Sequence, residues 1–302
     1  MASTVERLTK LGLINPPAFV VSNTMYETIM GSVAYGVSDD LSDFDTLGFA
    51  IPPKDMLFPH LAGEIQGFGR QKKRFMGYQQ HHVKDVSTGR EYDLNIYNIS
   101  TYFHLCMECN PNMVDSLFTP TNCVLHCTKV GNMVRDNRKI FLHKGAWHKF
   151  KGYAYSQLHS MDSKNPEPGS KRSIIRERYG YDVKFAYHVV RLIGEVEQIL
   201  VEGDIDLQRN REQLKAIRRG EVPVEDIRAY FSEKEKSLEK LYHESKLPYS
   251  PDEKAIRTLL MNCLEEHYGS LSDAVVNPDA AAVALAGIAE IVDSYQRSVA
   301  NR

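Results

Sequence analysis

Apolar and polar positions alternate in short runs in the first half of the chain, which is the period of a half-buried strand. Runs of this kind, rich in β-branched and aromatic residues, predict strands at 26–32, 44–51, 75–86 and 91–99. The last two are joined by the turn sequence STGR and predict a hairpin. Helical spacing predicts short helices at 3–12, 100–109 and 129–141, with Ser100 as a candidate N-cap of the second.

From about residue 145 onward, apolar residues follow the helical period almost without interruption. Helices are predicted at 146–161, 181–203, 223–246 and 250–269, and an alanine-rich helical stretch at 277–299. Ser250 and Pro251 are expected at the N-cap and first position of the fourth helix. The pattern predicts an α/β (α+β) protein with a mixed sheet in residues 1–142, followed by a mostly helical domain in residues 143–302.

Composition narrows the class of protein. Hydrophobic residues make up 42% and charged residues 25% of the 302 residues, as in ordinary globular proteins. No apolar run approaches the roughly 20 residues that span a bilayer, and the N-terminus is too polar for a secretory signal, so we expect a cytoplasmic protein with no membrane partner. The formal net charge of −2 indicates that any nucleic-acid surface must be local.

Five cysteines, an odd number, are expected to be free thiols in such a compartment. Their spacing also allows a zinc site, because a C-x2-C pair is followed by a C-x3-C pair with two histidines nearby: Cys106, Cys109, Cys123, Cys127, His104 and His126. We favour a core role, since Cys106 and Cys109 fall on the apolar face of the predicted helix 100–109 and cysteine packs there as a small hydrophobe.

The segment GSVAYGVSDDLSDFD (31–45) places candidate phosphate-binding groups and candidate metal-binding groups in one loop between two predicted strands. Gly31 lets the backbone approach a ligand closely, and turn N–H groups with the Ser32 hydroxyl can hold an anion. Asp43 and Asp45 project from one face of a strand, where two like charges need a cation. Mg²⁺ binds through one or two carboxylates plus substrate phosphates. A surface turn with solvated acids is the alternative.

This motif, G-S-x3-G-x5-S-D-x-D, resembles the signature of polymerase-β-type nucleotidyltransferases, and the chain most resembles their RNA-repair-pathway DNA polymerase β branch. Further segments resemble that branch: IYNISTYFHLCMECNPNMVDSLFTP (96–120), FKGYAYSQL (150–158) and YDVKFAYHVVRLIGEVEQILVEG (181–203). The resemblance implies a polymerase-β-like core and two Mg²⁺ ions, with Mn²⁺ as an alternative. It also implies that Gly31, Ser32 and Ser42 bind nucleotide and that Asp43 and Asp45 bind metal.

A third acidic ligand is implied by two-metal chemistry. Asp93 is the best candidate, since it lies within a predicted strand, where aspartate is disfavoured without a purpose, and the resemblance puts the third family aspartate there. Alternation puts Asp93, Asn95 and Tyr97 on one face and the apolar residues on the other. Asp85 and Glu91 are rival ligands, and an exposed acid on the outer face of the hairpin is the structural alternative.

The helix at 181–203 supplies a second group of candidates. Spacings of 3, 4 and 3 place Tyr181, Lys184, His188 and Arg191 on one face, where they are predicted to clamp a triphosphate and stack a base. A solvated polar face is the alternative. Two further pairs are weaker candidates. Lys171 and Arg172 could bind phosphate. His81 and His82 could bind metal, but adjacent residues of a strand face opposite ways and are not expected to share one ion.

The predicted reaction is attack of a hydroxyl on the α-phosphate of a nucleoside triphosphate, with pyrophosphate leaving. The branch implies an RNA 3′ end, of a tRNA-like molecule, as the acceptor. Two alternatives stay open: transfer to a protein or a small molecule, and a non-catalytic nucleic-acid-binding module on the same fold. The nucleotide, the number of additions and the oligomeric state are left open by the sequence.

Overall fold

A computed structural model describes residues 3–38, 44–69, 71, 73–163, 167 and 169–269, together with 285, 287–289, 291–292 and 295. Ser42 and Asp43 lie outside the described residues, and so does most of the predicted alanine-rich helix. No helix among the described residues has the length and apolarity needed to cross a membrane. The structure is an α+β protein with a mixed five-stranded sheet and many helices, which confirms the predicted fold class and is consistent with a polymerase-β-like core.

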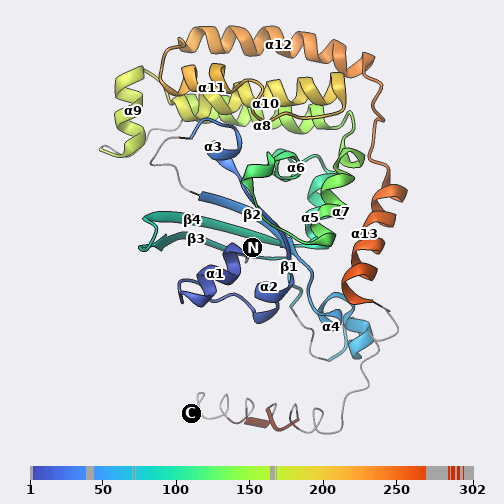
Figure 1. Cartoon of the computed structure of the whole chain (residues 1–302). Coiled ribbons are helices and arrows are strands. Elements are labelled where there is room, and N and C mark those ends of the chain that lie inside the picture. The colour runs from blue at the N-terminus through green and yellow to red at the C-terminus, as the bar shows by residue number, and fades with distance from the viewer. Residues whose placement is uncertain are drawn as a thin grey trace. The chain divides into compact units, whose positions relative to one another are not determined.

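The sheet has the order β3-β4-β2-β1-β5 (Figure 1). Its strands are β1 (Thr24–Ile29), β2 (Phe44–Ala50), β3 (Gly77–Asp85), β4 (Arg90–Asn98) and β5 (Val124–Cys127). The β2–β4 pair is parallel and the other three pairs are antiparallel. The predicted strands and the β3–β4 hairpin are therefore confirmed, while β5 was not predicted.

Helices cover both faces of the sheet (Figure 1). On one face, α1 (Thr4–Lys10) and α2 (Ala18–Asn23) pack against Tyr92, Leu94 and Ile96 of β4. The opposite face meets α5 (Ile99–Met107), α6 (Pro111–Phe118) and α7 (Lys129–Asp136). There the rings of Phe49 in β2 and Tyr102 in α5 lie 4.9 Å apart. Successive strand residues point to opposite faces, so this alternation fixes which β4 side chains reach each layer.

The long helices of the second half pack around α10, which is buried on almost every side. Asp182 caps its N-terminus through the Lys184 and Phe185 amides, and Gly203 ends it in the left-handed conformation. The helices packed against α10 (Val183–Glu202) are α8 (Ala146–Ser163), α9 (Lys171–Tyr179), α11 (Arg211–Arg218) and α12 (Val224–Glu244), and the chain continues into α13 (Glu253–Tyr268). The first helix of the chain is anchored differently, since the buried Glu27 of β1 accepts from the amides of Thr4, at 2.6 Å, and Val5.

Two predicted caps are wrong by two residues. Asn98, not Ser100, caps α5 and accepts from the Ser100 amide, and Asp252, not Ser250, accepts from the Ala255 amide at the start of α13. Both segments offer several cap-competent side chains in a row, and tertiary packing selects among them.

The chain forms two compact units. The first comprises residues 1–52 and 75–267 and contains the sheet and the helices that surround α10. The second comprises residues 53–74 and 268–302 and includes the short helix α4 (Lys54–Leu57), whose Lys54 lies over the Tyr268 ring. The predicted boundary at residue 142 separates the part of the chain that forms the sheet from the part that is mostly helical. As a boundary between domains it stays a prediction.

Candidate functional site

Two aspartates face each other across the parallel strands β2 and β4. Asp45 is the register partner of Asp93. Neighbouring strands lie about 4.8 Å apart, and register partners point to the same face, so the two carboxyl groups are side by side. Asp45 is exposed and the Asp93 side chain is 24% exposed, whereas the next residues of β2 are buried. The pair therefore lies near the solvent-exposed start of β2, between two interior strands of the sheet.

The glycine–serine turn lies against the first of these aspartates. Gly31 begins the four-residue helix α3 (Gly31–Ala34) with φ +65°, a conformation that only glycine adopts freely. A Cβ added to Gly31 would lie within 3.0 Å of Asp45 Oδ2. The backbone is tied to the same strand, because the Met30 amide donates to the Asp45 carbonyl at 2.7 Å. Ser32 follows directly, and its carbonyl accepts from the Val37 amide.

Asp93 is held by the neighbouring edge strand. The His82 amide donates to Asp93 Oδ1 at 2.7 Å, and His81 Nδ1 lies 3.7 Å from the same oxygen. Glu91, a rival candidate, instead contacts His82 Nδ1 at 2.6 Å. The polar face predicted for β4 is confirmed, since its residues alternate between buried and half-buried along the strand.

Asp85, the other rival ligand, has a structural role. Its buried carboxylate pairs with Arg7 of α1 at 2.6 Å and accepts from the Ser87 amide and hydroxyl. The Ser87 hydroxyl and the Arg7 guanidinium hold the pKa of Asp85 below its usual range. This carboxylate ties the tip of the β3–β4 hairpin to α1, so it is not available to a metal at the β2–β4 edge.

The paired aspartates fit a divalent cation. Carboxylate oxygens are the ligands that Mg²⁺ prefers, and two on one face need a positive charge between them. Within the described part of the chain, no group of three or more His, Cys, Asp or Glu side chains could hold a metal. Asp43, the other acid of the D-x-D motif, lies outside that part, so its contribution to the site stays a prediction.

The predicted common face of the long helix does not exist as an exposed surface. Tyr181 precedes α10, is 5% exposed, and donates from its hydroxyl to the Val222 carbonyl at 2.6 Å. Lys184 is exposed and His188 is partly buried, but Arg191 is 3% exposed. Arg191 and Tyr181 are packed inside the protein and do not form the predicted exposed face, and their contact with nucleotide stays a prediction. The alternative of a solvated polar face fails for the same reason.

Arg191 belongs to a buried charge cluster of four residues. Its guanidinium donates to Asp115 of α6 and to Glu195 one turn along α10, at 2.8 Å to Oε2. It also stacks on the ring of Tyr35, 4.3 Å from the centroid, and the Tyr35 hydroxyl donates to Asp115 Oδ2 at 2.9 Å. Burial raises the pKa of Glu195 well above its ordinary value, although Arg191 opposes this shift. The cluster joins α10 to the residue that follows α3.

Further polar contacts run from the helical region to the loop after α3. Gln208 donates to the Ala34 carbonyl at 3.1 Å, and Arg218 donates to the Val37 carbonyl at 2.6 Å. Burial lowers the pKa of His188 well below 6.5, and the cations Arg191, Lys184, Arg218 and Arg172 lower it further. The Nδ1 atom of His188 is buried without a hydrogen-bond partner among the described residues. Lys184 and His188 thus lie in a positively charged environment.

Sequence reasoning did not identify Tyr35, Asp115, Gln208 or Arg218. A signal existed for Asp115, an acid between apolar residues of a short helix, and for Tyr35, which belongs to the quoted AYG segment. The other two lie in a polar stretch of the chain that carries no distinguishing pattern.

The cysteines are free thiols, as expected. Burial raises the pKa of Cys109 to about 12, which opposes the thiolate that zinc requires. The core role is therefore supported among the described residues, and the zinc alternative is not.

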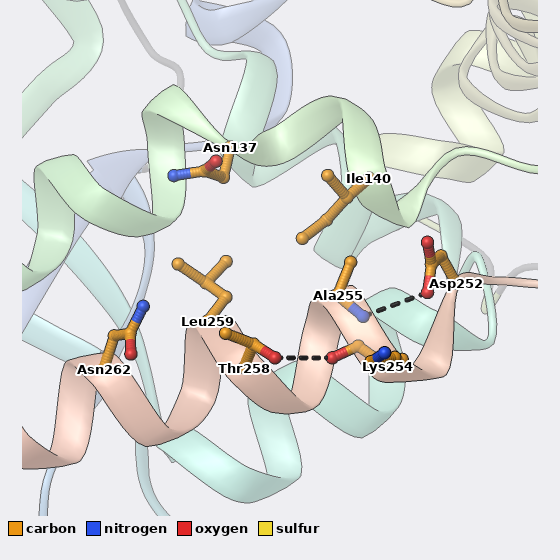
Figure 2. A pocket seen from close by; sticks show the side chains of 8 residues that line it. All are labelled: Asn137, Ile140, Asp252, Lys254, Ala255, Thr258, Leu259 and Asn262. Carbon is orange, nitrogen blue, oxygen red and sulfur yellow. Dashed lines mark hydrogen bonds between the residues drawn. The ribbon is translucent and has the colours of Figure 1, made fainter.

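Two hollows of the surface can be compared with these residues. A cavity of about 410 Å³ separates α13 from the segment around Asn137 and Ile140 (Figure 2). Its α13 wall includes Leu259 and Asn262, and none of the predicted site residues lines it. A second hollow, of about 400 Å³, is lined by Tyr181 together with residues 220–225.

Comparison with known proteins gives one match. No curated protein and no solved structure matches the chain. The family model described as RNA repair pathway DNA polymerase beta family matches residues 14–261, which include β1, α3, β2, β4 and the helices around α10. That family supports a role of the nucleotidyltransferase type. With the fold, the glycine–serine turn and the paired aspartates in place, we conclude that the chain belongs to the RNA repair pathway DNA polymerase beta family.

Proposed function

We propose that this protein is a metal-dependent nucleotidyltransferase that moves a nucleoside monophosphate from a nucleoside triphosphate to a hydroxyl acceptor and releases pyrophosphate. The observation that carries the proposal is the register pairing of Asp45 with Asp93 directly beside the Gly31 turn. A structural sheet edge gains nothing from two adjacent like charges, whereas a cation-binding edge requires them.

Each residue of the candidate site has a role in this proposal. Asp45 and Asp93, together with Asp43, hold the divalent cations; when bound, two Mg²⁺ ions, or Mn²⁺, supply charge stabilisation at the attacking and leaving oxygens. The Ser32 hydroxyl and the turn amides donate to the β- and γ-phosphates, with Ser42 as a further predicted donor. Lys184 provides positive charge beside the triphosphate, and His188, whose lowered pKa keeps the imidazole neutral, offers a hydrogen-bonding group there.

The sheet order suggests a direction for the reaction. The turn that grips the phosphates follows β1, whereas Asp93 lies on β4, on the other side of β2. In-line displacement places the attacking and leaving oxygens on opposite sides of the phosphorus. The leaving pyrophosphate therefore lies toward β1 and the acceptor hydroxyl approaches from the β4 side, where Asp93 can orient it.

An RNA 3′ end is the acceptor that the family description favours. Transfer to a protein or a small molecule is the second candidate, because this fold serves many acceptors. Incubation with each labelled triphosphate, Mg²⁺, and pools of RNA or protein separates the two, since ribonuclease or protease then releases the label. Absence of label from every pool would leave the non-catalytic RNA-binding reading as the better one.

Asp45→Asn tests the metal edge itself, because it keeps the shape of the side chain and removes only its charge. We expect loss of transfer, with an unchanged or higher Tm in chelator, since repulsion from Asp93 is relieved. Asp226→Asn, an exposed acid in the first turn of α12, is the matched control and should transfer normally. Transfer by Asp45→Asn at the wild-type rate would refute the assignment.

A further inference from the structure

The edge strand β3 carries one extra residue opposite Asp93. Gln80 pairs with Leu94 and Val83 pairs with Tyr92, so two residues, His81 and His82, stand against the single Asp93. This is a β-bulge, in which one residue leaves the ladder and the strand bends. Val83 still reaches the core face, where it is 5% exposed, so the hairpin keeps its hydrophobic register on both sides of the bulge.

The bulge turns a backbone amide toward the aspartate. His82 has φ +57°, one of two positive values among the described non-glycine residues. In this left-handed conformation its N–H donates to Asp93 Oδ1 at 2.7 Å instead of to a strand partner. The imidazole is 79% exposed, and its Nδ1 lies 2.6 Å from Glu91 Oε1, a contact that holds the bulged residue over β4.

We propose that the His82 bulge is a positioning device for Asp93: its backbone N–H fixes one carboxylate oxygen and leaves the other to a divalent cation shared with Asp45. This inference rests on the proposed function. The Asp93 side chain is 24% exposed and would otherwise rotate among several conformers, and this conformational freedom would be lost when the ion binds. Bulges are over-represented beside active sites, where they redirect the groups of the bulged strand.

Two other groups could orient Asp93, and the geometry ranks them lower. The His81 imidazole is 3.7 Å from Asp93 Oδ1, beyond hydrogen-bond distance, and is 50% exposed. The Glu91 carboxylate has the same charge as Asp93 and contacts His82 instead. The amide at 2.7 Å is the shortest contact described for the Asp93 carboxylate.

The decisive variants separate the amide from the side chain. Deletion of His82 restores regular pairing of His81 with Asp93 and removes the bulged N–H. His82→Pro keeps the strand length but removes the N–H and, because proline fixes φ at about −65°, also the left-handed conformation. His82→Gly keeps the N–H and favours the left-handed conformation, so it is the conservative control. His81→Ala tests the imidazole. The readout is Mn²⁺ affinity, measured by electron paramagnetic resonance with a non-hydrolysable nucleoside triphosphate present, alongside Tm in chelator.

We expect deletion of His82 and His82→Pro to weaken Mn²⁺ binding by about 10- to 100-fold, the usual cost of losing an outer-shell partner. His82→Gly should bind nearly as tightly as the wild type, and His81→Ala likewise. If Asp93→Asn loses Mn²⁺ while both donor-removing variants retain it, the positioning role is overturned and the metal site stands. If only one of the two donor-removing variants folds, the Mn²⁺ affinity of that variant alone decides whether the positioning role holds. If the wild type fails to bind Mn²⁺ with triphosphate, the proposed function and this inference fall together.

Discussion

Replacement of Gly31 by alanine gives a sharp test of the site, because one methyl group meets two separate constraints. The first is local, since φ at Gly31 is +65°. The second is the close approach to Asp45 Oδ2, where an added Cβ would lie within 3.0 Å. Gly12, just after α1, offers a matched control: its φ is +68°, and nothing lies within 4 Å of an added Cβ. Gly12→Ala therefore carries the backbone strain without the contact.

The magnitudes follow from these two constraints. An L-residue in the left-handed region costs about 1–2 kcal/mol, and the stiffer unfolded chain returns about 0.4–1 kcal/mol, so Gly12→Ala should lose roughly 1 kcal/mol. Gly31→Ala must also push the Asp45 side chain off its rotamer, at about 0.5–1.5 kcal/mol more. A total near 2 kcal/mol lowers Tm by about 3 °C in a chain of 302 residues, whose unfolding entropy is roughly 0.6 kcal/mol/K.

The assay pairs thermal unfolding in chelator with calorimetry of a Mg²⁺–triphosphate complex. We expect Gly12→Ala to lose some stability and keep its nucleotide affinity. Gly31→Ala should lose more stability and most of its affinity, because displaced Asp45 no longer faces Asp93. Equal Tm values for the two variants, with wild-type affinity in both, would refute the idea that Gly31 makes room for the Asp45 carboxylate.

Three further results are expected. Arg191→Met should lower the free energy of unfolding, measured in urea, by about 3–5 kcal/mol, because it leaves Asp115 and Glu195 buried without their cation. A small loss of stability together with weakened nucleotide binding would instead support the predicted contact of Arg191 with nucleotide. Lys184→Ala should weaken triphosphate binding in calorimetry and change stability by about 0.5 kcal/mol or less, since Lys184 is exposed. Ser87 and Arg7 lower the pKa of Asp85, so the Asp85 carboxylate stabilises the fold above about pH 3.9, and this contribution is lost as the pH falls below that value. The difference in free energy of unfolding between the wild type and Asp85→Asn, measured by urea unfolding, should therefore become smaller from pH 7 to pH 3. A difference that stays constant over this range would contradict the ion pair.

The sheet was largely predictable because its signals are local. Period-two alternation identified four strands, and the STGR turn identified the hairpin. β5 escaped because it has only four residues and none is fully buried. α6 was not predicted, although Asn110 caps it and Pro111 occupies its first position, which is an ordinary helix start. The pairing of Asp45 with Asp93 depends on strand order, which no local pattern specifies.

The long helix shows where periodicity misleads. The spacing of Lys184, His188 and Arg191 correctly places them on one side of α10. It predicts that this side is exposed only if one side of the helix meets solvent. α8, α11 and α12 surround α10, so a polar residue on that line is buried unless it lies near the helix start. Arg191 is tolerated there because Asp115, far away in the sequence, supplies a partner.

The charge cluster around Arg191 also bears on how the chain folds. Tyr35 and Asp115 belong to the part of the chain that forms the sheet, and Arg191 and Glu195 belong to the long helix. A fragment that ended at residue 142 would keep a buried aspartate and lose the guanidinium that neutralises it. Sheet and helices should therefore unfold in a single cooperative transition, and the first 142 residues on their own should be prone to misfold, even though they contain every acidic residue assigned to the metal site.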